Sequence, residues 1–220
     1  YDLLDRLTKA FPDVLFEGCS GGGGRFDAGM LYYTPQIWCS DDTDPHERTL
    51  IQYGTSFFYP PDTVGSHVSA SPNHQTGRRT SLETRAAAAM PGTFGYELDP
   101  ETLDDLEREE IRGMNQLYRD LQPLIFHGQY DRLTSPDQGM ALWEISDDNR
   151  VLVQGLVYET EPNALRRRVR LRGLDPEAVY KDADGLRRTG QALMTGGLLL
   201  PVTSGTDAPV TVILEREKTQ

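Results

Sequence analysis

Three aspartates stand within four positions of the sequence, directly after a short apolar run. They are Asp41, Asp42 and Asp44, and the run before them contains Ile37 and Trp38. An apolar run of this length that ends in polar residues is typical of a buried parallel strand, whose carboxyl end presents side chains to a site. Carboxylates placed there can transfer protons or bind a divalent cation.

The sequence around the three carboxylates predicts different tasks for them. An aspartate-rich metal site would need a second acidic cluster and a nearby basic group for phosphate, and the sequence places neither there, so no metal is expected. Asp44 precedes Pro45 and Glu47, which is typical of a helix N-terminus, so we expect Asp44 to cap that helix. Asp41 is the first acid after the apolar run and is expected to project into the site, whereas Asp42 fits either task.

A run of four glycines at 21–24 follows Cys19 and Ser20, again after an apolar run. A phosphate-binding P-loop would need a Lys-Ser or Lys-Thr pair after the glycines, but Arg25 follows instead. Glycines there can let the backbone approach a ligand closely, or they can simply turn the chain. Catalysis by a cysteine nucleophile is not expected, because no base accompanies Cys19.

The elements expected to position these residues alternate between strand and helix. Strands are predicted at 14–18, 36–40, 66–69 and 93–98, with helices between them and a long helix at 102–126. This pattern indicates a parallel sheet, and four βα units are half of an eight-stranded barrel. A Rossmann-like open sheet is the alternative, although no Gly-x-Gly-x-x-Gly turn has its partner acid in place.

Two other helices have their own signals. Thr80 and Glu83 form a second capping pair, ahead of the alanine run at 86–89. An N-terminal helix is predicted from apolar residues that share one face, namely Leu3, Leu4, Leu7 and Phe11. Because no capping residue precedes this helix, we expect the sequence to start inside a larger domain.

After residue 127 the pattern changes to short β-rich runs separated by turn residues. Strands are predicted at 141–146, 150–158 and 210–215. Such runs indicate a small antiparallel β domain. The predicted fold class is therefore α/β: the C-terminal half of a (β/α)8 TIM barrel at 1–127, followed by an antiparallel, β-sandwich-like domain at 128–220.

Composition restricts the class of partner. The 220 residues carry a formal net charge of −12, which argues against a nucleic-acid partner and suits a neutral ligand such as a sugar. No apolar stretch approaches the ~20 residues of a membrane helix, so no membrane partner is expected. Cys19 and Cys39 are expected to be free thiols in a reducing compartment, which predicts a cytoplasmic protein, with a disulfide between them as the alternative.

Cys19, Gly22 and Arg25 match a Cys-x-x-Gly-x-x-Arg signature, and the residues at 38–44 match Trp-x-Ser-Asp-Asp-x-Asp. In this order and spacing the two motifs resemble the retaining α-galactosidases of glycoside hydrolase family 36. The resemblance implies that Asp41 is the general acid/base. It also implies that the galactose unit is bound by Cys19, Ser20, Gly22, Arg25 and Trp38. The Trp38 ring would then cover a face of the sugar, with packing at the barrel mouth as the alternative.

The resemblance further implies a galactose-containing oligosaccharide as substrate, hydrolysis with retention of configuration, and no cofactor. The family's nucleophile lies in a Lys-x-Asp strand end, a motif absent from this sequence. We therefore expect the nucleophile upstream, in an N-terminal half of the same polypeptide, and we expect a homo-oligomer and an inactive isolated segment. The alternatives are an α-N-acetylgalactosaminidase or a galactosyl-transferring synthase on the same scaffold, or a non-catalytic carbohydrate-binding remnant.

Overall fold

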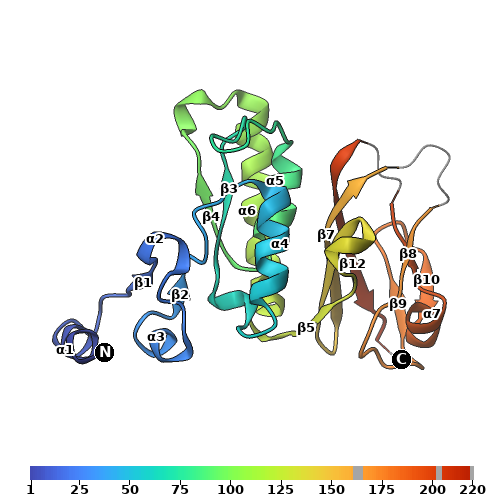
Figure 1. Ribbon diagram of the computed structural model, residues 1–220. Helices are drawn as coiled ribbons and strands as arrows, with labels where there is room; N and C mark the ends of the chain where they lie inside the picture. The colour runs from blue at the N-terminus through green and yellow to red at the C-terminus, as the bar shows by residue number, and fades with distance from the viewer. Residues whose placement is uncertain (161–165, 202–204, 219–220) are drawn as a thin grey trace. The chain divides into compact units, whose positions relative to one another are not determined.

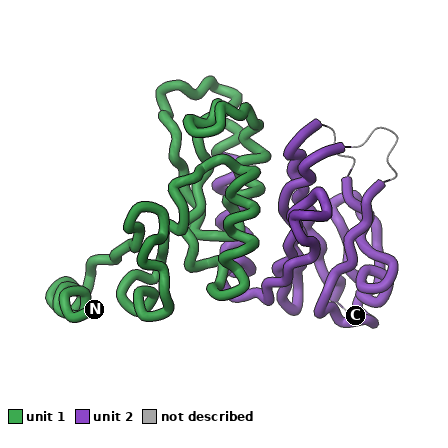
Figure 2. The backbone as a smooth tube through the Cα atoms, viewed as in Figure 1, with its two compact units in different colours: residues 1–111 green, residues 112–220 purple. Residues whose placement is uncertain are grey.

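The computed structural model describes residues 1–160, 166–201 and 205–218. Contacts divide the chain into two compact units, Tyr1–Ile111 and Arg112–Gln220, which are green and purple in Figure 2. The division falls inside helix α6 (Asp105–His127), whereas the boundary drawn from the sequence follows the end of that helix. The second half of α6 belongs to the second unit because its apolar residues pack in a core there.

The first unit contains four short strands in two parallel pairs (Figure 1). The strands are β1 (Glu17–Gly18), β2 (Gln36–Ile37), β3 (Gly65–Ser69) and β4 (Thr93–Glu97). β1 pairs with β2 and β3 pairs with β4, and a single parallel bridge between Ile37 and Val64 joins the two pairs. The strands therefore follow one another in chain order and in one direction, as the alternating sequence pattern predicts.

Helices precede, connect and follow these strands. They are α1 (Asp2–Ala10), α2 (Ser20–Gly23), α3 (Ala28–Tyr33), α4 (Pro45–Thr55), α5 (Leu82–Ala89) and the short 3-10 helices η1 (Pro61–Thr63) and η2 (Pro100–Thr102). α5 is buried along its length and packs against β3. Its cap is Ser81, whose hydroxyl accepts the Thr84 N–H at 3.1 Å, so the predicted cap at Thr80 is wrong by one residue.

The predicted strand at 14–18 is wrong for its first three residues. Only β1 forms, and Leu15 is 88% exposed. An extended segment becomes a strand only where a neighbour offers backbone partners, and β2 offers two paired positions. The apolar face of α1 is also uncovered, since Leu3 and Phe11 are exposed.

The second unit is built on a six-stranded antiparallel sheet in the order β10-β9-β12-β7-β6-β5. Its strands are β5 (Gln129–Arg132), β6 (Met140–Ser146), β7 (Arg150–Glu159), β9 (Val179–Lys181), β10 (Arg187–Thr189) and β12 (Thr206–Arg216). A smaller antiparallel pair, β8 (Arg168–Val169) and β11 (Leu198–Leu199), completes the strands of the described residues, together with helix α7 (Gly190–Thr195) and the 3-10 helix η3 (Pro136–Gln138). The antiparallel strand arrangement predicted for this part of the chain is confirmed.

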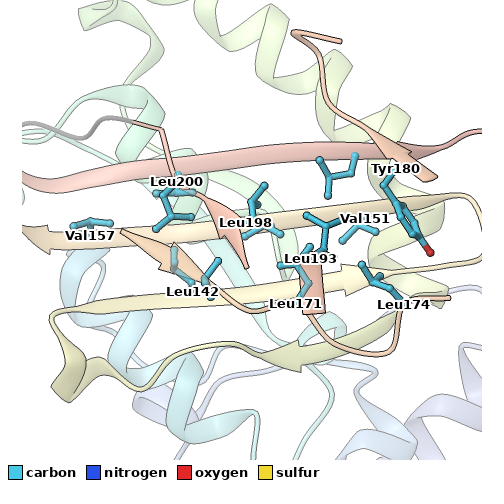
Figure 3. Packing of buried hydrophobic residues seen from close by; sticks show 13 residues of the cluster. Leu142, Val151, Val157, Leu171, Leu174, Tyr180, Leu193, Leu198 and Leu200 are labelled. Atoms are coloured by element: carbon cyan, nitrogen blue, oxygen red, sulfur yellow. The ribbon is translucent and has the colours of Figure 1, made fainter. Parts of the chain in front are cut away.

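Two apolar clusters use opposite faces of this sheet. Leu142 on β6 packs with Leu193, Leu198 and Leu200 in the cluster drawn in Figure 3. The next residue, Trp143, points to the other face, as alternation along a strand requires, and packs with residues of α6. The predicted apolar stripe of α6 is therefore buried only toward its C-terminal end, while Leu106 is 77% exposed.

Candidate active site

The glycine run forms one left-handed turn. Ser20, Gly21, Gly22 and Gly23 all have positive φ, between 58° and 84°, and the Gly23 N–H donates to the Cys19 carbonyl at 2.7 Å. A left-handed turn costs an L-residue roughly 1–2 kcal/mol per position because Cβ approaches the following carbonyl, and glycine avoids that cost. Ser20 adopts this conformation without being glycine, which is a feature of functional sites.

The turn lies directly against the residues that follow β2, from Cys39 to Asp41. A Cβ atom at Gly22 would stand 2.9 Å from the Asp41 nitrogen, and one at Gly23 would stand 2.7 Å from the Cys39 carbonyl oxygen. The glycines therefore turn the chain and let it approach the residues after β2 closely, whereas close approach to a ligand stays a prediction. The approach brings the two sequence motifs into contact, so that Gly22 and Asp41 are neighbours.

The structure separates the three aspartates by environment. Asp44 is completely buried and caps α4, accepting the His46 N–H at 2.9 Å, and its carboxylate pairs with Arg78 Nε at 3.1 Å. Asp42 accepts the Asp44 N–H at 3.0 Å. Asp41, in contrast, is exposed. The predicted cap at Asp44 is confirmed, and Asp41 is the most exposed of the three carboxylates.

Trp38 forms a side-chain hydrogen bond with Asp41. The indole Nε1–H donates to Asp41 Oδ1 at 3.1 Å. The ring stacks on His67, with centroids 4.6 Å apart and planes 26° apart, and the Arg48 guanidinium carbon lies 4.7 Å from the ring centroid. His67 in turn faces Glu97, with Nδ1 3.6 Å from Oε2. The Trp38 ring is therefore held by protein groups while its N–H engages the carboxylate.

The other predicted site residues lie near the turn. Cys19 and Ser20 are exposed at its start, and Cys19 is a free thiol, as is Cys39. Arg25 is exposed and makes no hydrogen bond or ion pair with the described residues, while its neighbour Phe26 stacks on Tyr59. The structure thus joins Gly22, Trp38 and Asp41 by contact and does not join Arg25 to them.

The sequence patterns did not identify Arg48, His67 and Glu97 as part of this site. Arg48 is 3% exposed although it is charged, and it lies one turn into the helix that Asp44 caps. A charged residue on the inner face of a helix is a signal that could have drawn attention to it, because buried arginines need polar partners. His67 and Glu97 lie on the paired strands β3 and β4, and the sequence does not specify the register of that pairing.

Among the described residues, histidine, cysteine and acidic side chains form no group of three or more that could hold a metal ion. No helix in the same part of the chain is long and apolar enough to cross a membrane.

Two family models match the chain in succession. The Melibiase model matches residues 1–128, and the model described as the glycosyl hydrolase family 36 C-terminal domain matches residues 140–213.

Relatives with close sequences agree with these matches. The chain is 53% identical over 205 residues to a bifunctional alpha-galactosidase/sucrose kinase of Mediterraneibacter gnavus and 46% identical over 208 residues to alpha-galactosidase AgaA of Geobacillus stearothermophilus. These alignments cover 91% and 93% of the chain but only 22% and 28% of the relatives.

Solved structures give the same result. The galactosidase domain of the alpha-galactosidase–sucrose kinase AgaSK superposes with a TM-score of 0.96 at 49% identity, covering 99% of the chain and 31% of that structure. Alpha-galactosidase AgaA from Geobacillus stearothermophilus, solved in complex with raffinose, superposes with a TM-score of 0.94 at 42% identity, with the same two coverages. The chain belongs to the melibiases of glycoside hydrolase family 36 and spans about a quarter of the length of these relatives.

Proposed function

We propose that this chain supplies the general acid/base and part of the sugar pocket of a retaining α-galactosidase, and that the complete protein removes terminal, non-reducing α-galactose from oligosaccharides such as raffinose or melibiose. The observation that carries the proposal is the placement of Asp41. Its carboxylate is exposed in the segment that follows β2, next to the glycine turn, and accepts a hydrogen bond from the Trp38 N–H. The named relatives, which are alpha-galactosidases, support the same substrate class.

The chemistry requires a carboxyl group in this setting. A glycosidic oxygen is a poor leaving group until it is protonated, and in retaining enzymes the proton donor lies ~5–5.5 Å from a second carboxylate that attacks the anomeric carbon. The bond between the leaving oxygen and the anomeric carbon breaks as Asp41 gives its proton to that oxygen. Asp41 then takes a proton from water, whose oxygen displaces the sugar from the nucleophile.

The nucleophile is proposed to lie upstream, in a half-barrel that completes the first unit. Four parallel strands in chain order support a half-barrel here, because closure of an eight-stranded barrel needs four more. The exposed apolar side chains of Leu3, Phe11 and Leu15, all within the first 15 residues, support an adjoining segment that covers them. The greater length of the relatives supports it as well.

The proposal is tested on the complete protein with paired substrates. We expect an aryl α-galactoside to be hydrolysed far faster than the matching aryl α-N-acetylgalactosaminide, and NMR of the first product to show α-galactose. Preference for the N-acetyl sugar, transfer without hydrolysis, or sugar binding without turnover would favour the alternative functions. The isolated segment of 220 residues is expected to show no turnover, because it lacks the covalent step; measurable hydrolysis would refute the upstream nucleophile.

Cys19 provides a second prediction. If it shapes the pocket beside the 2-hydroxyl of galactose, Cys19→Ala in the complete protein should raise the KM for galactosides about tenfold, since a lost pocket contact is worth roughly 1–3 kcal/mol. The configuration of the product should not change. Cys39→Ala, which alters the other free thiol, is the matched control. A covalent sugar on Cys19, detected by mass spectrometry, would contradict the assignment.

A further inference from the structure

We propose that Arg48 is a positioning residue for Asp41. It acts through the ring of Trp38 and through the backbone carbonyl of Ser40, the residue before Asp41. The inference rests on the proposed role of Asp41 and adds a residue that touches neither substrate nor the reacting atoms.

Arg48 ties together two neighbouring segments of the parallel sheet. Its Nη1 donates to the Ser40 carbonyl at 3.0 Å, and its Nη2 donates to the Gly65 carbonyl at 2.7 Å. Ser40 directly precedes Asp41, and Gly65 is the first residue of β3. The planar guanidinium suits such a link, because its donors point in fixed directions from one rigid group.

This link matters because β2 and β3 are otherwise weakly joined. Within the described residues, their backbone pairing is the single bridge between Ile37 and Val64. β3 and β4, by comparison, are paired over five positions, from Gly65 with Thr93 to Ser69 with Glu97. The Arg48 bonds thus replace backbone ladder contacts at the point where the chain carries Asp41.

The same guanidinium supports the donor to Asp41. It lies 4.7 Å from the centroid of the Trp38 ring, within the range of a cation–π contact. His67 stacks on that ring as well, which fixes the plane of the indole. The Nε1–H of Trp38 therefore points at Asp41 Oδ1 from a ring that protein groups hold in place. Loss of the Arg48 fork releases both the backbone before Asp41 and the ring that binds its carboxylate.

The chain offers a matched control in Arg85. Arg85 is also buried, lies on the next helix, and donates from Nη1 to the carbonyl of Ser69 at the end of β3. Like Arg48, it is a buried arginine that donates to a backbone carbonyl of the sheet, but its hydrogen bonds are made to Ser81 and Ser69 and not near Trp38. A variant at Arg85 reports what loss of such a support does to folding alone.

The test compares Arg48→Lys, Arg85→Lys, Trp38→Phe and Asp41→Asn in the complete protein. Each variant is assayed for kcat/KM with an aryl α-galactoside, which has a good leaving group, and with melibiose, which has a poor one. The ratio of the two constants does not depend on how much enzyme is folded, because both substrates meet the same folded fraction. Misplacement of a proton donor lowers the constant for melibiose more than the constant for the aryl substrate.

We expect Arg48→Lys and Trp38→Phe to change this ratio about tenfold or more in the direction of Asp41→Asn, since small misplacements of reacting groups cost up to about 100-fold. Arg85→Lys should leave the ratio unchanged even if it lowers the melting temperature. A changed ratio in Asp41→Asn but not in Arg48→Lys rejects the positioning role alone. An unchanged ratio in Asp41→Asn rejects the proposed role of Asp41, and the positioning role with it.

Discussion

Replacing Asp41 with asparagine in the complete protein should lower the hydrolysis of melibiose by about 10²–10⁴-fold, which is the contribution of a positioned general acid. An asparagine amide cannot protonate the leaving oxygen, so the loss should be largest for substrates whose leaving groups need that proton. An activated aryl galactoside should lose much less in its first step. Azide should then restore turnover of the covalent intermediate, because it attacks without help from a base. Steady-state kinetics with and without azide measure both effects.

Asp44→Asn is the control for this experiment. Asp44 is a buried helix cap that also pairs with Arg78, so its replacement should lower the stability of the first unit and leave the leaving-group dependence unchanged. Asparagine caps a helix about as well as aspartate, so the loss of stability comes from the broken pair between the buried carboxylate and Arg78. Intact melibiose hydrolysis in Asp41→Asn, together with its abolition in the folded Asp44→Asn enzyme, would reverse the assignment of cap and catalyst.

The second large effect is a change of stability with pH, and it is expected in the second unit, at Glu144. This residue lies on β6, where its side chain is completely buried, and it accepts the backbone N–H of Arg172 at 2.9 Å. Its other carboxyl oxygen has no hydrogen-bond partner among the described residues. Burial raises the pKa of Glu144 from its ordinary 4.5 to about 7, with a smaller raising effect from the charge of Asp131 and an opposing one from the Arg172 N–H.

The sign of the stability change follows from the higher pKa in the folded state. Below about pH 4.5 both states hold the proton, and the contribution of Glu144 to folding is fully present. Between pH 4.5 and 7 only the folded state keeps the proton, so the free energy of unfolding falls as pH rises. Because one pKa unit corresponds to about 1.4 kcal/mol, the total fall is roughly 3 kcal/mol, and the curve flattens above pH 7.

Glu144→Gln should remove this dependence, since the amide has no proton to lose and its oxygen can still accept the Arg172 N–H. Calorimetric unfolding of the complete protein at pH 5 and pH 8 measures the difference between variant and wild type. The variant should gain stability relative to wild type at pH 8. Glu215→Gln, at an exposed position on β12, is the matched control and should show no such gain. An equal difference between Glu144→Gln and wild type at the two pH values would refute the prediction.

Much of the fold follows from local signals in the sequence. The order and direction of the four parallel strands, the Asp44 cap and the antiparallel second unit all depend on short-range patterns of apolar, turn and capping residues. The predicted strand at 14–18 failed because an extended apolar run becomes a strand only beside a partner, and Leu15 lacks one in the described chain. The presence of a partner is not a property of the run itself.

The sequence predicts which residues form the site, but it does not predict which other side chains hold them in place. Asp41 and the glycines can be recognised in the sequence because each follows an apolar run directly, at the place where a buried strand presents residues to a site. Arg48 could not be found in this way, because its partners are the carbonyls of Ser40 and Gly65, and every residue has a carbonyl. The left-handed conformation of the glycine turn could not be predicted either, since four glycines permit many conformations and only packing against Cys39 and Asp41 selects one.

The position of β12 has a consequence for protein synthesis. It is the last strand of the described residues, yet it lies between β7 and β9 in the sheet. A nascent chain that has not yet released β12 from the ribosome can pair β5, β6 and β7, but β9 and β10 then have no way to join them. The unpaired edge of β7, lined by Val151 and Val153, stays open to other chains during that interval. A ribosome that stalls shortly before β12 would therefore leave an aggregation-prone chain, although almost all of its core residues had already been made.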